Sequence, residues 1–111
     1  MTESSPYRIV LSTCPDEDSA RRIANTLVEG HLAACVSIIP GLRSVFRWEG
    51  KVESADETLL VIKTRQEQYA PLEAVLRDHH PYALPEILSF SVDAGLSAYL
   101  AWIDASLADP Q

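Results

Sequence analysis

The sequence predicts one small α+β domain, in which a sheet is backed by helices. Three observations support this class: the chain has 111 residues, 47% of them are hydrophobic, and strand-like runs alternate with amphipathic helical segments. The predicted order is strand, helix, strand, strand, helix, strand, helix. We expect the domain to span residues 7–107, between a disordered N-terminal tail at 1–6 and a C-terminal tail at 108–111.

The first predicted elements are a strand from Tyr7 to Cys14 and the helix that follows it. The strand contains a continuous apolar, β-branched run, which is typical of a central strand. Acidic residues from Asp16 onward are typical of a helix start. Their carboxylates accept hydrogen bonds from unpaired backbone amides and interact favourably with the positive end of the helix dipole. Gly30 is placed to end the helix. One stripe of the helix is apolar and consists of Ala20, Ile23, Ala24, Leu27 and Val28.

Two long strands are predicted next, at 34–48 and 51–64, joined by a turn at Glu49-Gly50. Pro40-Gly41 interrupts the first of them, and because proline cannot donate to a ladder, this break is either a bulge or an edge. Arms of this length protrude beyond a small domain. Two long strands that protrude into water on their own would be only marginally stable, so we expect another subunit to cover them.

The second half of the chain supplies a helix, a strand and a final helix. The helix runs from about Gln68 with Pro71 in its first turn, and Pro81 must end it. An alternating strand is predicted at 86–92. The last helix carries an apolar stripe that consists of Leu96, Tyr99, Leu100, Ile103 and Leu107. The first six elements form the split βαβ of a ferredoxin-like sandwich.

The charge balance and the N-terminus exclude several classes of function. A formal net charge of −7 argues against a nucleic-acid partner, since phosphate binding needs clustered lysine and arginine. The N-terminus lacks the features of a signal peptide, and no apolar run reaches the length of a membrane span. We therefore expect a cytoplasmic protein whose two cysteines are thiols, with no membrane partner.

The stretch His79–Glu86, with the sequence HHPYALPE, is the most function-like part of the chain. Imidazole, phenol and carboxylate groups suit borderline divalent metals, and the two prolines fix where these side chains point. The competing interpretation is a helix stop followed by a loop, with Tyr82 packing and His79 facing the edge of the core. The residue types alone leave both interpretations open.

Three further side chains have two interpretations each. Cys14 ends a strand just before a helix N-terminus, where a thiolate would be reactive, but a small buried hydrophobe is favoured. Packing is also favoured for Cys35. Trp48, at the predicted hairpin tip, either anchors a subunit contact or packs across the hairpin. No phosphate loop, nucleophile elbow or metalloprotease motif is present, so we expect no enzymatic activity.

Six ordered motifs nevertheless resemble one family across nearly the whole chain. They are Leu32-Ala33-Ala34-Cys35, Ile39-Pro40-Gly41, Trp48-Glu49-Gly50-Lys51, Lys63-Thr64, His80-Pro81-Tyr82-x-x-Pro85-Glu86 and Tyr99-x-x-Trp102. Together they resemble the CutA divalent-cation-tolerance family. That resemblance implies a ferredoxin-like subunit similar to PII signalling proteins, in a homotrimer whose long hairpin strands pair between subunits.

The same resemblance implies copper-type divalent-cation (Cu²⁺) binding in metal tolerance. The ligands proposed in the family are a cysteine, a histidine and a glutamate, which suggests His80 and Glu86 here. Some relatives carry the cysteine where this chain has Ser12, so Cys14 or Cys35 would have to substitute. We expect the inter-subunit contacts to include Trp48, Tyr82, Pro40 and Gly41.

An alternative function is a PII-like scaffold that binds a small anionic metabolite or a protein partner between subunits. Its positive groups would come from Arg43, Arg47, Lys51 and Lys63, and Trp48 would form an aromatic wall.

Overall fold

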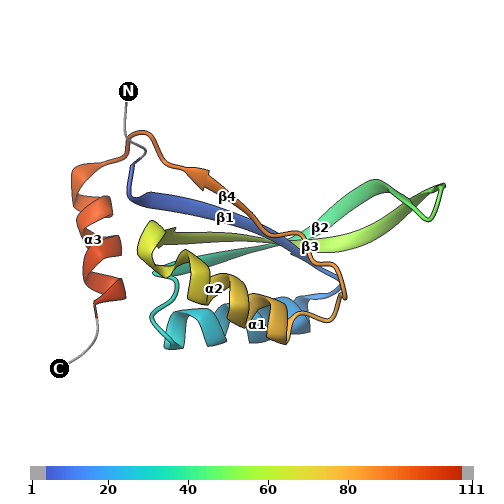
Figure 1. The fold of residues 1–111 in the computed structure, drawn as a ribbon, viewed down its shortest axis with the longest axis horizontal. Coiled ribbons are helices and arrows are strands. Elements are labelled where there is room, and N and C mark those ends of the chain that lie inside the picture. The colour runs from blue at the N-terminus through green and yellow to red at the C-terminus, as the bar shows by residue number, and fades with distance from the viewer. Residues whose placement is uncertain (1–4, 109–111) are drawn as a thin grey trace.

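A computed structural model of the chain describes residues 5–108 (Figure 1). The predicted N-terminal tail therefore lies mostly outside the described residues, as does the C-terminal tail beyond Ala108. The elements follow the predicted order: β1 (Tyr7–Cys14), α1 (Glu17–Glu29), β2 (Cys35–Trp48), β3 (Lys51–Arg65), α2 (Gln66–His79), β4 (Leu88–Ser91) and α3 (Ser97–Leu107). This is the ferredoxin-like βαββαβ arrangement with an added C-terminal helix.

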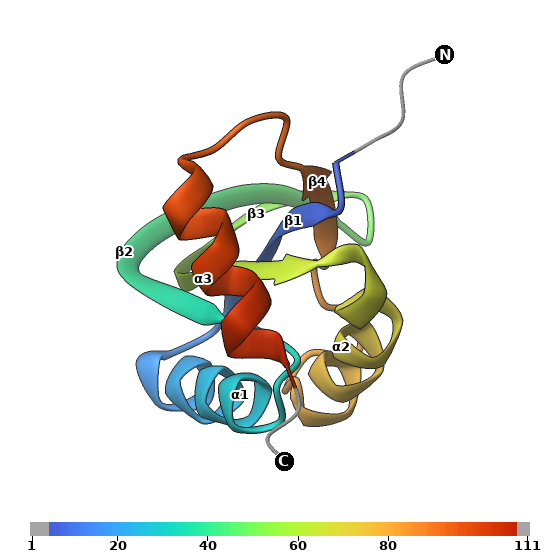
Figure 2. The same cartoon turned by 90° about the vertical axis from the view of Figure 1, so that its left-hand side faces the viewer.

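The four strands form one antiparallel sheet in the order β2-β3-β1-β4. Helices α1 and α2 lie side by side along one face of this sheet, and α3 crosses one end of the molecule (Figures 1 and 2). The β2–β3 hairpin extends well past the helices on the opposite end (Figure 1), and the molecule measures 46 × 36 × 23 Å. The overlong arms predicted from the sequence are thus a single protruding hairpin.

Local sequence signals account for α1. Asp16 caps its N-terminus, because the side chain accepts a hydrogen bond from the Ser19 amide at 2.7 Å. Gly30 stands at the C-terminal cap position, as predicted. The predicted stripe is buried except for Val28, whose side chain is 40% exposed.

The hairpin shows why Pro40-Gly41 interrupts β2. The register between β2 and β3 shifts between Ile39 and Leu42, which is a bulge, and Gly41 has a φ of +81° that L-residues rarely adopt. At the tip, Glu49 and Gly50 have φ values of +49° and +80°, as a tight primed hairpin turn requires.

The core lies between the sheet and helices α1 and α2. Its fully buried side chains include Val10, Ile23, Leu27, Leu60, Ile62, Leu72 and Leu76. A smaller buried cluster packs α3 against the rest of the domain and consists of Ala34, Ile103 and Leu107.

The opposite face of the sheet carries apolar side chains with no helix over them. Strand register places Leu88 beside Leu11, and Phe90 beside Ile9, on this face. Leu88 and Phe90 are each about half exposed, as is Ile39 on β2. This open sheet face is therefore an unusually apolar surface for an isolated domain.

The structure corrects three details of the sequence prediction. Helix α2 starts at Gln66, so Pro71 lies inside the helix and not in its first turn. The N-cap residue Arg65 makes no capping hydrogen bond with its side chain, which removes the usual local signal for a start. The last strand is shorter than predicted, at Leu88–Ser91, and His79 is exposed rather than at the core edge.

Candidate functional site

His80 is the best-positioned polar residue of the His79–Glu86 segment. It is the C-cap residue of α2 and is only 8% exposed. Its Nδ1 accepts a hydrogen bond from the Tyr82 amide at 3.1 Å, so the proton of the neutral ring is on Nε2. Nε2 then donates to the Thr13 carbonyl at 2.8 Å. The imidazole thus joins the end of β1 to the loop after α2.

Cys14 lies against the same imidazole. Its Sγ is 3.9 Å from His80 Nε2, although the two residues are 66 positions apart in the sequence. The thiol has no exposed surface, and burial raises its pKa to about 11. Burial also lowers the pKa of His80 below its usual value. Cys14 is therefore the buried, protonated thiol that the packing interpretation favoured.

Tyr82 connects this cluster to the hairpin. Its hydroxyl donates to Glu57 Oε2 at 2.9 Å, and its ring lies 5.1 Å from the His80 ring. Burial and this hydrogen bond to a carboxylate raise the pKa of Tyr82 to about 12. Glu57 itself is only 9% exposed, and it forms no ion pair with any other residue that the structure describes.

An open groove lies between the hairpin and the loop Pro81–Glu86, with a volume of about 930 Å³. Its carboxylates are Glu53, Glu57 and Glu86, and neither arginine nor lysine lines it. Phe46, Trp48 and Leu84 are among its apolar walls. The remaining lining residues are Thr13, Ser44, Val45, Ala55, Pro81, Tyr82, Ala83 and Pro85.

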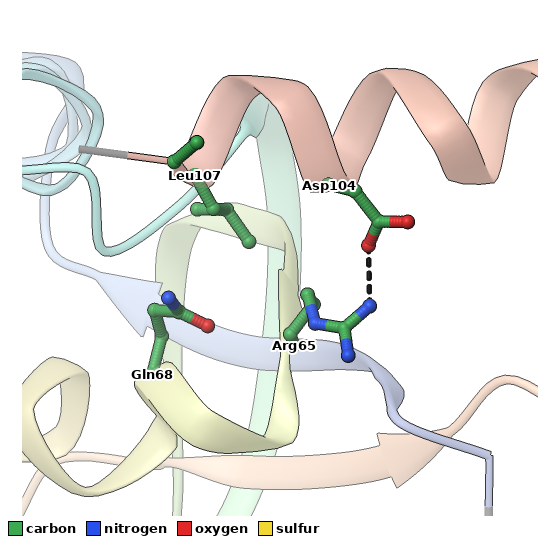
Figure 3. A pocket seen from close by; sticks show the side chains of 5 residues that line it. Arg65, Gln68, Asp104 and Leu107 are labelled. Carbon is green, nitrogen blue, oxygen red and sulfur yellow. Dashed lines mark hydrogen bonds and ion pairs between the residues drawn. The ribbon is translucent and has the colours of Figure 1, made fainter. Parts of the chain in front are cut away.

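A smaller hollow, of about 400 Å³, lies at the other end of the sheet, where α3 meets the start of α2 (Figure 3). Arg65 forms ion pairs with Asp104 and with Glu67 there. Gln68 Oε1 is shielded from solvent and has no hydrogen-bond partner in the described part of the chain. None of the residues predicted for a site lines this hollow.

The predicted site residues fall into three places. Cys14 and His80 are in contact, and Glu86 is an exposed residue of the groove nearby. Cys35 is half-buried on β2, where its Sγ is 3.7 Å from Lys63 Nζ. Ser12 is fully buried and its hydroxyl has no partner among residues 5–108.

The residues predicted for subunit contacts are mostly at the surface. Trp48 is 50% exposed, and Pro40 and Gly41 are exposed at the bulge. Tyr82 is half-buried and is already bonded to Glu57 within the chain.

Sequence reasoning missed Glu53 and Glu57. On β3, residues 53, 55 and 57 alternate onto one face of the hairpin, opposite Phe46, Ser44 and Leu42 of β2. This period of two was readable from the sequence, but the position of the Pro81–Glu86 loop beside it was not.

No three histidine, cysteine, aspartate or glutamate side chains within residues 5–108 are grouped closely enough to hold a metal ion. None of the helices in this part of the chain is both long and apolar enough to cross a membrane.

The fold and the site define a ferredoxin-like protein with a protruding hairpin and an acidic groove at its base. The sequence profile of the CutA1 divalent ion tolerance proteins matches residues 8–106. The chain belongs to this family.

Individual relatives agree with this assignment. The divalent-cation tolerance protein CutA of Pectobacterium atrosepticum is 44% identical, over 89% of this chain and 90% of the relative. The chloroplastic protein CutA of Arabidopsis thaliana is 42% identical over 96% of this chain, which spans only 60% of that protein's length. The crystal structure of CutA from Xylella fastidiosa superposes with a TM-score of 0.91, at 41% identity, and covers 94% of this chain and 100% of that one.

Proposed function

We propose that this chain is a non-enzymatic, homotrimeric protein of the cytoplasm that binds a copper-type divalent cation and acts in metal-ion tolerance. The observation that carries the proposal is the contact between Cys14 and His80. Thiolate and imidazole together are a donor set that copper accepts readily. Membership of a family described by divalent ion tolerance supports the class of ligand.

The spacing of this pair suits two ligands of one ion. A metal–sulfur bond of about 2.3 Å and a metal–nitrogen bond of about 2.0 Å together exceed the 3.9 Å between Sγ and Nε2. Both atoms are engaged in the metal-free protein: the thiol holds its proton, and Nε2 donates to the Thr13 carbonyl. Metal binding would therefore release the thiol proton and move the imidazole proton from Nε2 to Nδ1, so that the ring would lose its hydrogen bonds to both the Thr13 carbonyl and the Tyr82 amide.

Two donors do not complete a metal site, and residues 5–108 of one chain supply no third donor close by. We therefore place the remaining ligands, Glu86 among them, where subunits meet. Cys35 lies beside Lys63 and not beside His80, so Cys14 is the better substitute for the cysteine that Ser12 replaces.

The trimer is supported by surfaces that a single chain leaves uncovered. The open sheet face carries half-exposed Leu88, Phe90 and Ile39, and the hairpin carries exposed Val45 and Val52. β2 and β4 are sheet edges in the monomer, and a protruding edge strand is a template for pairing with another chain. Sedimentation of the purified protein at micromolar concentration is expected to give a single trimeric species, and a stable monomer would contradict this part of the proposal.

Calorimetric titration with Cu²⁺ tests the metal site. We expect Cys14→Ser and His80→Ala to weaken binding at least about tenfold, since each removes one bond to the ion. His79→Ala is the matched control, because His79 is an exposed histidine one position away. Equal affinities of the wild type and both site variants would remove this pair from the site.

The anion-binding alternative finds no support in the groove. Arg43 forms an ion pair with Asp56 at 3.2 Å, and Lys63 donates to Ser37 on the sheet. Neither of them lines the groove, and Arg47 and Lys51 do not line it either.

A further inference from the structure

We propose that the Cys14–His80 pair selects monovalent copper, Cu⁺, and holds it between two ligands in a nearly linear arrangement. This inference rests on the copper site of the proposed function and specifies the oxidation state of the ion. Cys14 is fully buried and His80 is 8% exposed within a single chain. The burial of both donors therefore does not depend on how subunits assemble.

The first argument is the charge that each ion would bring into the core. Cys14 belongs to the main buried apolar cluster, where a charge is costly unless another charge compensates it. A thiolate and Cu⁺ together are neutral, and the neutral imidazole adds nothing, whereas Cu²⁺ would leave one positive charge. Two carboxylates, Asp16 and Glu57, act on this thiol through their charge. Asp16 is engaged by the Ser19 amide, and Glu57 by the Tyr82 hydroxyl.

The second argument is the number of donors. Cu²⁺ favours a tetragonal set of ligands, whereas Cu⁺ is a soft d¹⁰ ion that thiolates select and that two ligands can satisfy. Residues 5–108 contain no group of three histidine, cysteine, aspartate or glutamate side chains that could hold a metal. Cys35 is no substitute for a third donor, because its Sγ is 3.7 Å from the Lys63 ammonium, which repels a cation.

The third argument is the distance between the two donor atoms. With bonds of about 2.3 Å to sulfur and about 2.0 Å to nitrogen, neighbouring ligands of a square Cu²⁺ site lie about 3.0 Å apart, and the two ligands of a linear ion about 4.3 Å. Sγ of Cys14 and Nε2 of His80 are 3.9 Å apart, which is nearer to the linear value. Either ion requires the thiol proton to leave and the imidazole proton to move to Nδ1, so these steps do not distinguish the two.

Competition with the chromophoric Cu⁺ chelator bicinchoninate, without oxygen and with ascorbate as reductant, measures the affinity of the assembled protein for Cu⁺. Calorimetry measures the affinity for Cu²⁺. We expect one Cu⁺ per chain, bound at least about a hundredfold more tightly than Cu²⁺ because Cu²⁺ leaves an uncompensated buried charge.

Variants assign the site. Cys14→Ser and His80→Ala are each expected to weaken Cu⁺ binding at least about tenfold, since each removes one of two bonds to the ion. Cys35→Ser and His79→Ala are the matched controls, and both are expected to bind Cu⁺ as the wild type does. Circular dichroism of every variant shows whether it is folded.

X-ray absorption at the copper edge of the wild type needs no variant, so it decides the geometry even if a substitution unfolds the chain. We expect one sulfur and one nitrogen neighbour and the strong pre-edge feature of linear Cu⁺. Three or four neighbours would overturn the proposal.

The binding results separate this inference from the proposed function. Cu²⁺ binding that depends on Cys14 and His80, without tighter Cu⁺ binding, would retain the proposed site and overturn the preference for Cu⁺. Tight Cu⁺ binding by this pair without Cu²⁺ binding would support the preference and remove the divalent ion from the proposed function. Cu⁺ affinity that falls in Cys35→Ser but not in Cys14→Ser would also overturn the inference.

Discussion

The imidazole of His80 and the carbonyl of Thr13 are joined by a hydrogen bond of 2.8 Å that ties the end of α2 to the end of β1. The opposite ring nitrogen accepts from the Tyr82 amide, so a single side chain fixes both the loop and the strand. The residue that we propose as a metal ligand is thus also a structural link. The two roles lead to separate predictions.

His80→Ala is expected to lower the free energy of unfolding by about 1–3 kcal/mol. The change removes two hydrogen bonds and leaves their backbone partners at Thr13 and Tyr82 without the imidazole. Urea denaturation followed by circular dichroism measures the effect. His79→Ala, at an exposed position, is expected to change stability by no more than about 0.5 kcal/mol. Equal stabilities of the two variants would contradict the structural role.

Stability is expected to fall at mildly acid pH because of the same residue. Burial holds the pKa of folded His80 below the value of about 6.5 typical of an unfolded chain. As the pH falls, the unfolded chain takes up the proton first, which favours unfolding. The contribution of neutral His80 is therefore fully present above about pH 6.5 and is lost as the pH falls through the folded pKa.

Urea denaturation of the wild type and of His80→Gln at a series of pH values checks this dependence. His80→Gln is expected to lose the part of the pH dependence of the unfolding free energy that His80 provides. His79→Gln is expected to keep it, since that side chain is exposed. A wild-type slope that His80→Gln leaves unchanged would assign the effect to other groups.

Copper affinity is expected to rise with pH across the neutral range. Burial raises the pKa of Cys14 to about 11, so near neutral pH the thiol must give up its proton when it binds the metal. One released proton corresponds to about a tenfold gain in affinity per pH unit. Calorimetry in buffers of different ionisation enthalpy counts the proton directly. Cys14→Ser is expected to remove this dependence, and a wild-type affinity that is flat with pH would argue against a Cys14 ligand.

Leu60→Ala is expected to cost about 2–5 kcal/mol of stability, because Leu60 is fully buried on β3 beneath the helices. Leu84→Ala is a matched control, since Leu84 is 74% exposed and its truncation creates no cavity. Thermal or chemical denaturation compares the two. A similar loss in both variants would mean that Leu84 is covered in the assembled protein.

The sequence predicts elements well wherever a local signal exists. Asp16 marks the start of α1 because its side chain caps an amide there. Gly30 stands where α1 ends, but its φ of −84° is open to any residue, and the left-handed residue after the helix is His31, with a φ of +59°. The start of α2 was misplaced because Arg65 caps it without a side-chain bond, so the helix follows β3 with no such residue. Because proline is common in the first turn of a helix, Pro71 favours a helix start just before it. In the structure α2 starts at Gln66, and Pro71 lies inside the helix.

The candidate site was predictable only in part, for a related reason. The residue types of the His79–Glu86 segment are visible in the sequence, but their partners come from β1 and β3. Whether Cys14 or Cys35 meets His80 depends on how the strands are ordered in the sheet, which no local pattern encodes. Glu57 was missed because its burial arises from the loop that folds over it.

The place of β1 in the sheet has a consequence for synthesis of the chain. β1 is made first, yet both of its partners, β3 and β4, come later in the sequence, and among the described elements β4 is the last strand to leave the ribosome. Until then an apolar strand has unsatisfied edges in the nascent chain. Such long-range pairing slows folding and exposes aggregation-prone surface. A nascent chain stalled before β3 should therefore engage chaperones strongly. Release of the hairpin should weaken this dependence by covering one edge of β1, and release of β4 should end it.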